Sequence, residues 1–600
     1  VAGSLLIDGA TGDGTVTLGP LTVGIGGLTI DGHLGGVQTV RLNGPSTVNG
    51  GVTILGGLLD DQVVVAGGLT VTQGDLSIIG TDTVVVGSTG RSEVTVDGPL
   101  TVAHGGLTID DHLGLGQTVR LNGPTTVNGN VSILGGTASD QLVVTGSLAV
   151  TGGLLIDGAT GQNEVTLNGQ LVIGAGGLTI DGDRGERLTA RLNAPATVIG
   201  NVLILGGGLA DTIELGAPLH VTAGKLTIDT TLSAGDELLG LDTVTLGGNV
   251  TTYGGDINVD AATIRVGATL DTRNANVKAG NITLGFVRPP DDGNPDTREG
   301  KIPDALGGQT ITVGAGARLL ADSTTLSLSG DVTLAAFVRD VSGALPVDVA
   351  PSPDPSITVG PGAEIRGAEI SLTAHKTSQT SLLPLSLLSL QHKTAKITIN
   401  GATIYGSGVT IAAKAEDTNP LEDDGTYNVV NNLAIQAPLT YLDIPALAGV
   451  PVLSAVSVQK RAADALVNLT GSTIHSTGDV DIGASIDATS EAKAAGGYDS
   501  RKLNPLEYVP FSAGYSRAEG SAQTLIGGSG SIRADGNVSI TSAAKIEASV
   551  QAFTAANATH TQISGAKSVP AVAISVTESD TTSKALVGPG VWISALGNVT

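Results

Sequence analysis

Acidic residues that follow glycine at the ends of apolar segments are the residues in this sequence best suited to chemistry. Three such segments read GGLLDDQV from Gly56, GGTASDQL from Gly135 and GGGLADTI from Gly206. They approach the GGxGxDx-apolar pattern, in which Asp carboxylates of successive nonapeptide turns bind calcium. The weak candidate calcium ligands in these segments are Asp60, Asp61, Asp140 and Asp211.

The spacing of these segments favours a structural role over a metal site. They recur at intervals of more than 70 residues, whereas calcium half-sites face one another only when the turns recur about every nine residues. Asp at a turn also accepts hydrogen bonds from nearby backbone N–H groups. We therefore expect the four carboxylates to cap turns. The sequence predicts no catalytic residue and no cofactor, with calcium as the one ion left open.

A second acidic pair is formed by Asp157 and Asp181, which end the similar segments LLIDG and LTIDG. If these segments are equivalent corners of neighbouring repeats, the two residues lie roughly 5 Å apart. Carboxylates at that distance can share a cation or a proton. Each also precedes Gly, so a turn role is again the favoured interpretation, and the pair joins the weak calcium candidates.

An enzyme that cleaves polysaccharides is the main catalytic alternative. Such an enzyme needs clustered acidic and basic groups and, for sugar binding, aromatic platforms. The chain has four Phe, seven Tyr and one Trp in 600 residues, and no acidic and basic cluster recurs in phase with the repeats. The sequence therefore predicts a protein that is not an enzyme.

Composition limits the partners and the type of core. The formal net charge of −26 disfavours nucleic acid, which is a polyanion. With no Cys, disulfides and zinc–thiolate sites are excluded. Gly is abundant at 88 residues, while aromatic residues make up 2% of the chain. A narrow interior of stacked Val, Ile, Leu and Ala, as in a solenoid, accounts for this balance.

Repetition supplies the fold. From Gln117 to Asp211, one pattern of about 24 residues is written four times, each with three short apolar segments separated by Gly, Asn, Asp or Pro. Within a segment, apolar residues alternate with Thr, Ser or Arg, which is the period of a β-strand. Three strands and three corners per repeat predict an all-β, right-handed parallel β-helix with roughly triangular coils, in which each coil buries its apolar face against the next.

Three regions follow one another along the chain. Residues 1–250 are compact, short-loop coils; residues 251–310 are transition coils with a loop rich in Pro and Asp; and residues 311–600 alternate coils with large insertions. The insertions share a period-two strand, a polar stretch and a second strand, which predicts β-hairpin arms. The apolar run from Leu433 to Val458 contains Gln, Asp and several prolines, so we expect an arm there and no membrane span.

The later coils carry a resemblance. Segments such as GSGSIRADGNVSITSAAKIEA from Gly528, combined with the earlier VTILGG and LTIDG coils, resemble the repetitive passenger regions of filamentous-haemagglutinin-like adhesins and related giant bacterial exoproteins. The resemblance covers nearly the whole chain and is one of architecture and composition. It implies secretion, display at the bacterial cell surface, and adhesion or matrix building.

The functional expectation is a stalk. We expect a non-enzymatic, structural or adhesive part of a giant secreted or cell-surface protein. The first residues, VAGSLLIDGATG, match the repeat from Val150 to Gly161, so we expect the chain to be a segment of a longer repetitive protein. The expected partner is a glycan or protein receptor on a host or neighbouring cell. Lateral self-association through the arms of residues 311–600 is a further expectation, and it leads to the alternative of a self-assembling extracellular fibre or surface-layer component.

Overall fold

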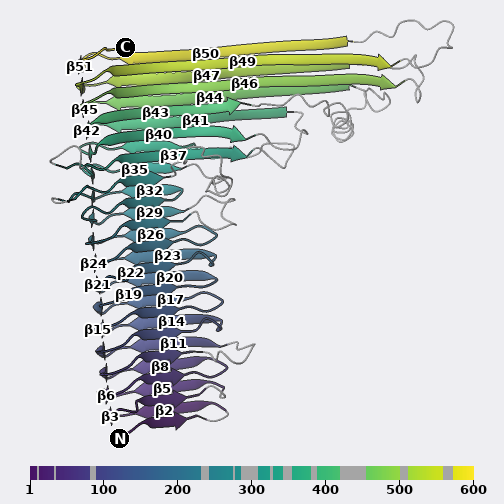
Figure 1. Cartoon of the computed structure of the whole chain (residues 1–600). Helices are drawn as coiled ribbons and strands as arrows, with labels where there is room; N and C mark the ends of the chain where they lie inside the picture. Colours follow the sequence, from purple (N-terminus) through teal and green to yellow (C-terminus); the bar gives the residue numbers. More distant parts are fainter. Residues whose placement is uncertain are drawn as a thin grey trace.

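The structure, a computed structural model, describes residues 1–9, 12–32, 36–80, 90–230, 242–274, 277–285, 309–323, 329–341, 354–379, 388–418, 454–499, 511–557 and 572–600. All regular elements within these ranges are β-strands. They form three parallel sheets of 17 strands each. The chain visits sheets A, B and C in turn and then returns to sheet A one level higher, as Figure 1 shows. The predicted right-handed parallel β-helix is confirmed.

Sheet A carries the segments that end in the LxID corners. Neighbouring strands pair in parallel and in register, so that Leu107 faces Val131 and Ile109 faces Ile133 one coil later. Its strands are β1 (Leu5–Asp8), β4 (Leu28–Asp31), β7 (Val52–Leu55), β10 (Leu76–Ile79), β13 (Leu107–Asp110), β16 (Val131–Leu134), β19 (Gly153–Asp157), β22 (Gly177–Asp181), β25 (Val202–Leu205), β28 (Leu226–Asp229), β31 (Ile257–Asp260), β34 (Ile282–Gly285), β37 (Val332–Val341), β40 (Glu369–Gln379), β43 (Gly408–Thr418), β46 (Val480–Asp499) and β49 (Val538–Asn557).

Sheet B follows sheet A in every coil and carries the TVRL-type segments. Its strands are β2 (Gly14–Leu18), β5 (Gln38–Leu42), β8 (Asp61–Val65), β11 (Arg91–Val96), β14 (Gly116–Leu121), β17 (Gln141–Val144), β20 (Gln162–Leu167), β23 (Arg187–Leu192), β26 (Thr212–Leu215), β29 (Thr243–Leu246), β32 (Thr263–Val266), β35 (Thr310–Val313), β38 (Ser356–Val359), β41 (Leu388–Asn400), β44 (Ser454–Thr470), β47 (Phe511–Gly527) and β50 (Val572–Val587).

Sheet C has the shortest strands and completes each coil. Its strands are β3 (Leu21–Val23), β6 (Ser46–Val48), β9 (Leu69–Val71), β12 (Leu100–Val102), β15 (Thr125–Val127), β18 (Leu148–Val150), β21 (Leu171–Ile173), β24 (Ala196–Val198), β27 (Leu219–Val221), β30 (Val250–Thr251), β33 (Thr269–Asp271), β36 (Arg318–Leu320), β39 (Glu364–Arg366), β42 (Thr403–Gly406), β45 (Thr473–Ser476), β48 (Ser531–Ala534) and β51 (Trp592–Ala595).

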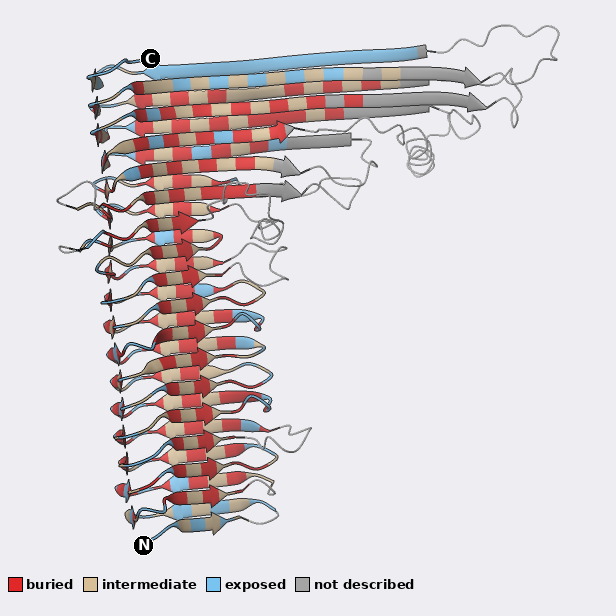
Figure 2. Ribbon diagram, in the orientation of Figure 1, coloured by how far each residue is buried: buried red, intermediate tan, exposed pale blue. Residues whose placement is uncertain are grey.

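The core is one continuous column of aliphatic side chains. In most strands alternate residues point inward, and Figure 2 shows the resulting alternation of buried and less buried positions along the rod. Val, Ile, Leu and Ala from Val23 to Val538 form a single buried cluster that runs past residues 250 and 311 without a break. Because each coil packs on the coils above and below, its apolar face is buried only within the stack.

The arms differ from the predicted β-hairpins. From β37 onward in sheet A and from β41 onward in sheet B, the strands lengthen to between 10 and 20 residues and extend beyond the rod on one side (Figure 1). Each long strand pairs in parallel with its equivalents in neighbouring coils, as β46 does with β43 and β49. The outgoing and returning strands of one coil therefore lie in two different sheets. The arms are extensions of sheets A and B, because a neighbouring coil offers each long strand a partner in register, as β40 does for β37 and β44 does for β41.

Some predicted features lie outside the described residues. These include the loop rich in Pro and Asp, whose central residues 286–308 are not described, and most of the apolar run, at residues 433–453. Within the described ranges, the structure contains no helix that is long and apolar enough to span a membrane. The division of the chain at residues 250 and 310 stays a prediction.

Candidate functional site

The corner between sheets A and B carries a column of inward-facing polar residues. They occupy the position just before the first outward residue of each sheet B strand, where the chain turns into the core. We call this set the corner column: Gln38, Asp61, Ser92, Gln117, Asp140, Asn163, Asp211, Asp242 and Gln309. Register places these residues one above another, for example Asp61, Ser92 and Gln117. Leu188 and Ala262 interrupt the column.

Each column Asp accepts a hydrogen bond from the coil below. The N–H of Gln38 donates to Asp61 Oδ1 over 2.9 Å, that of Gln117 to Asp140 Oδ1 over 2.6 Å, and that of Leu188 to Asp211 Oδ1 over 2.6 Å. These carboxylates therefore satisfy backbone donors at the corner, which would otherwise be buried without a partner.

The predicted turn capping is confirmed for two of these residues. The N–H of Gly57 donates to Asp61 Oδ2 over 2.8 Å, and the N–H of Gly136 donates to Asp140 Oδ1 over 3.1 Å. Asp60 differs because it is exposed, and its Oδ1 accepts from the N–H of Arg91 in the next coil over 2.9 Å. In all three cases the carboxylate is engaged by backbone N–H groups.

Burial makes the column Asp residues weak acids. Removal from water raises the pKa of Asp61 to about 7 and that of Asp140 to about 6, against the opposing effect of the backbone hydrogen bonds. Burial also raises the pKa of Asp211 to about 7 and that of Asp242 to about 6, and at Asp211 the negative charge of Asp242 adds to the increase. The N–H of Asp211 donates to Asp242 Oδ1 over 2.8 Å. The column therefore changes its charge near neutral pH.

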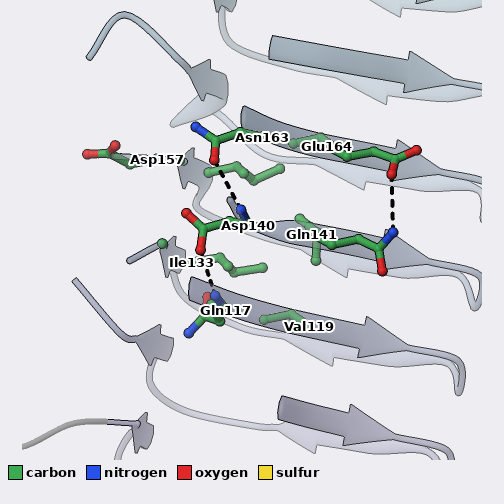
Figure 3. A pocket seen from close by; sticks show the side chains of 13 residues that line it. Gln117, Val119, Ile133, Asp140, Gln141, Asp157, Asn163 and Glu164 are labelled. Atoms are coloured by element: carbon green, nitrogen blue, oxygen red, sulfur yellow. Dashed lines mark hydrogen bonds between the residues drawn. The ribbon is translucent and has the colours of Figure 1, made fainter. Parts of the chain in front are cut away.

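A small cavity opens on this column between β14, β17 and β20. Its volume is about 20 Å³, and it is lined by Gln117, Asp140 and Asn163 together with aliphatic side chains (Figure 3). Gln117 Nε2, Asp140 Oδ2 and Asn163 Nδ2 are buried and have no hydrogen-bond partner within the described residues. One acceptor and two donors match a single buried water, which typically makes about three hydrogen bonds.

These three polar atoms are a poor match for calcium. Calcium takes six to eight oxygen ligands, whereas the cavity presents one carboxylate oxygen and two amide nitrogens. Figure 3 shows the Asp157 carboxylate directed away from the other labelled side chains. Among the described residues, no group of three or more His, Cys, Asp or Glu is arranged to hold a metal ion. Calcium binding by this chain stays a prediction.

Register also separates the three nonapeptide-like segments. Asp61 and Asp140 are three coils apart in the column, as are Asp140 and Asp211, so the structure does not bring these carboxylates together. Asp157 and Asp181, in contrast, are direct partners in sheet A, as expected.

The sheet A pair also caps turns. Asp157 Oδ1 accepts from the N–H of Ala159 over 2.8 Å, and Asp181 Oδ1 accepts from the N–H of Asp183 over 3.1 Å. Burial raises the pKa of Asp181, with further contributions from the negative charges of Asp183 and Asp157. Each of the two carboxylates therefore already has a structural role.

Sequence reasoning missed four members of the column that matter to its chemistry: Ser92, Gln117, Asn163 and Asp242. Their types differ, and what they share is their position. Asp242 directly precedes TVTL as Asp211 directly precedes TIEL. An alignment of all coils on their sheet B strands would have revealed this common place.

Comparisons with known proteins identify no relative of this chain. No family model matches the sequence, and neither a curated protein nor a solved structure matches it. The resemblance to filamentous-haemagglutinin-like adhesins stays a prediction.

Proposed function

We propose that this chain is a non-enzymatic, structural and adhesive stalk of a giant secreted or cell-surface bacterial protein. The observation that carries the proposal is the uninterrupted stack of coils around a single core. With 17 strands in each sheet and a strand spacing of about 4.8 Å, the rod is about 80 Å long. Such a rod separates whatever lies at its two ends by a fixed distance.

The arms support a second part of the proposal, which is lateral association. The extensions of sheets A and B pack face to face and enclose buried polar contacts, such as the 3.1 Å ion pair between Arg461 and Asp417. Their outer faces carry charged pairs that cross from one coil to the next, for example Lys460 with Glu519 at 2.6 Å. These ordered, charged faces offer a repeating surface to a second rod, which favours a fibre or surface-layer component as the alternative role.

Negative-stain electron microscopy of the purified protein distinguishes a monomeric stalk from a fibre that assembles through the arms. Single rods of about 80 Å at all protein concentrations, with or without calcium, would support a stalk that acts as a monomer. Bundles or continuous fibres that grow with concentration would support assembly through the arms. Compact particles would contradict the stalk.

A binding assay tests the adhesive part. The chain should attach to host or neighbouring bacterial cells through a glycan or protein receptor and leave that receptor unchanged. Release of shortened or unsaturated sugar products from polysaccharide during the assay would contradict a non-enzymatic role and support the enzymatic alternative.

A further inference from the structure

The outer face of sheet C changes character along the rod. In the first half, the middle residue of the strands is mostly small and uncharged, as in Thr22, Thr47, Thr70, Thr101 and Thr126. In the second half, large cationic and aromatic residues occupy one outward column in register.

That column brings together four residues from four successive coils. Arg366 faces Tyr405, Tyr405 faces His475, and His475 faces Arg533. Trp592, in the next coil, faces Ser531 on the adjacent outward column. A step of two residues along a strand and one strand across gives roughly 8 Å between the Cα atoms of Trp592 and Arg533. We call these five residues the sheet C strip.

Side chains of the strip stack on one another. The Arg366 guanidinium lies 4.6 Å from the centre of the Tyr405 ring, which is within range of a cation–π contact. The rings of Tyr405 and His475 are 5.9 Å apart between their centres and inclined by 52°. Arg366 also forms an ion pair with Glu364. The Arg366 side chain therefore supports Tyr405 from below, and its charge is already partly compensated.

The strip is open to solvent. Tyr405 is 36% exposed, and Trp592, the one Trp of the sequence, occupies an outward position in register with Ser531. Arg533 is exposed and forms no ion pair with any residue in the described part of the chain. An exposed Trp beside an uncompensated Arg is unusual for a surface without a binding partner, because large aromatic and Arg side chains are enriched where proteins bind others.

The outer face of sheet C from β36 to β51 carries more positive than negative side chains, whereas the chain as a whole is acidic. Outward positions from β36 to β51 carry three Arg (Arg318, Arg366 and Arg533) and His475 against Glu364 alone. The whole chain has a net charge of −26. Asp322 pairs with Arg366 at 3.7 Å at the lower end of the strip. In the upper part, Asp479 and Asp535 lie in the corners beyond β45 and β48 and not on the strands.

We propose that the sheet C strip binds an acidic, uronate-containing oligosaccharide. Tyr405 and Trp592 offer flat faces against which sugar rings can pack, and Arg533 can pair with a carboxylate through two parallel hydrogen bonds. The strip follows the rod axis over several coils, so an extended chain of sugars can contact successive levels.

This inference rests on the proposed adhesive function and names its receptor chemistry. Sheet C lies on the side of the rod opposite to the arms (Figure 1). A ligand on the strip would therefore leave the outer faces of the arms free. Binding and lateral association would use separate surfaces of the same coils.

The test uses the whole chain and the fluorescence of its single Trp. Oligogalacturonate is the probe, and its methyl ester, which lacks the charge, is the matched neutral ligand. We expect a saturable change in Trp592 fluorescence with oligogalacturonate, and a much weaker one with the ester. Arg533→Gln should weaken binding about tenfold, which corresponds to the loss of one charge-assisted contact. Tyr405→Ala should weaken it while protease resistance stays unchanged.

Arg265→Gln provides the control, because Arg265 is also exposed on a strand, but on sheet B. An equal effect of Arg265→Gln and Arg533→Gln, or the absence of any fluorescence change, would overturn the proposal. Attachment of the chain to cells is measured in parallel. If Arg533→Gln and Tyr405→Ala leave attachment intact, the strip is not the receptor site and the adhesive function stands. If oligogalacturonate binds but cells do not, the strip stands and the adhesive function fails.

Discussion

Replacing Asp211 with Asn tests whether the corner column makes the rod sensitive to pH. Asp211 is 1% exposed, and burial raises its pKa from 3.8 to about 7. Because the folded pKa is the higher one, the contribution of this group to stability is complete below pH 3.8 and is lost as pH rises through 7. The raised pKa costs the folded state about 2 kcal/mol at pH 5, where the buried carboxyl must keep its proton, and about 4 kcal/mol at pH 8, where it is largely ionised.

The Asn side chain should remove this cost without breaking the corner. Its Oδ1 can still accept the hydrogen bond from the N–H of Leu188, as Asn163 Oδ1 does from the N–H of Asp140 over 3.2 Å. We therefore expect Asp211→Asn to stabilise the surrounding coils, with a gain about 2 kcal/mol larger at pH 8 than at pH 5.

Amide hydrogen exchange measured by mass spectrometry gives the opening free energy of peptides from β23 to β29 at both pH values. An infrared titration of protonated carboxyl groups should show one group fewer titrating near pH 7. Asp60→Asn is the control, since it removes the same charge from an exposed side chain. An equal gain at both pH values, or lower stability at pH 8, would refute the reasoning.

Three further substitutions test the corner, the core and the arms. Gly135→Ala would place a Cβ 2.1 Å from Asp140 Oδ2 and should cost about 1–3 kcal/mol; thermal melting should show that adding Asp140→Ala restores part of the loss. Val119→Asp puts a charge at a position that is 1% exposed and should cost more than about 4 kcal/mol, so limited proteolysis should cut its own and neighbouring coils. Asp417→Ala removes the 3.1 Å ion pair with the buried Arg461 and should cost about 3–5 kcal/mol, whereas the double variant Asp417→Leu, Arg461→Met should stay close to the parent in hydrogen exchange of the arms.

The coils could be predicted from sequence because their signal is local. Alternation of apolar and polar residues in segments such as Thr118 to Leu121 fixes which side chains point inward, and a shift by one residue would reverse every face. Repetition then identifies the partner of each segment as its copy one coil later, for example Leu107 with Val131. Local pattern and repeat length together determine the register.

The arms could not be predicted in the same way. Two period-two strands joined by a polar stretch have the same pattern whether they pair with each other or each with its equivalent in the next coil. The structure shows the second arrangement, as in β47 with β44 and β50. The deciding factor is the stack below, which presents an open strand edge in register at the base of every arm.

Sequence analysis singled out three Asp residues of the corner column but recognised neither site as a whole, because each coil supplies only one residue. Members of the corner column vary between Asp, Asn, Gln and Ser, so no motif repeats. The strip draws Tyr405, His475 and Arg533 from positions 58 to 70 residues apart, and only the register of sheet C brings them together. Aromatic residues that are scattered in the sequence therefore gather on one face.

The corner column also explains how a core of interchangeable aliphatic residues keeps a unique register. A strand that slipped by two residues would still place Val, Ile or Leu inward, at little cost in buried apolar area. The slip would, however, move Asp140 away from the N–H groups of Gln117 and Gly136 and leave polar groups buried without partners. We infer that the hydrogen bonds of the column select one register. The same buried Asp side chains lower the stability of the fold above neutral pH, where they ionise. The exchange experiment on Asp211→Asn tests this inference, because Asn keeps the hydrogen bond and should therefore preserve one uniform protection pattern. Two coexisting patterns in that variant would show that the charge itself fixes the register.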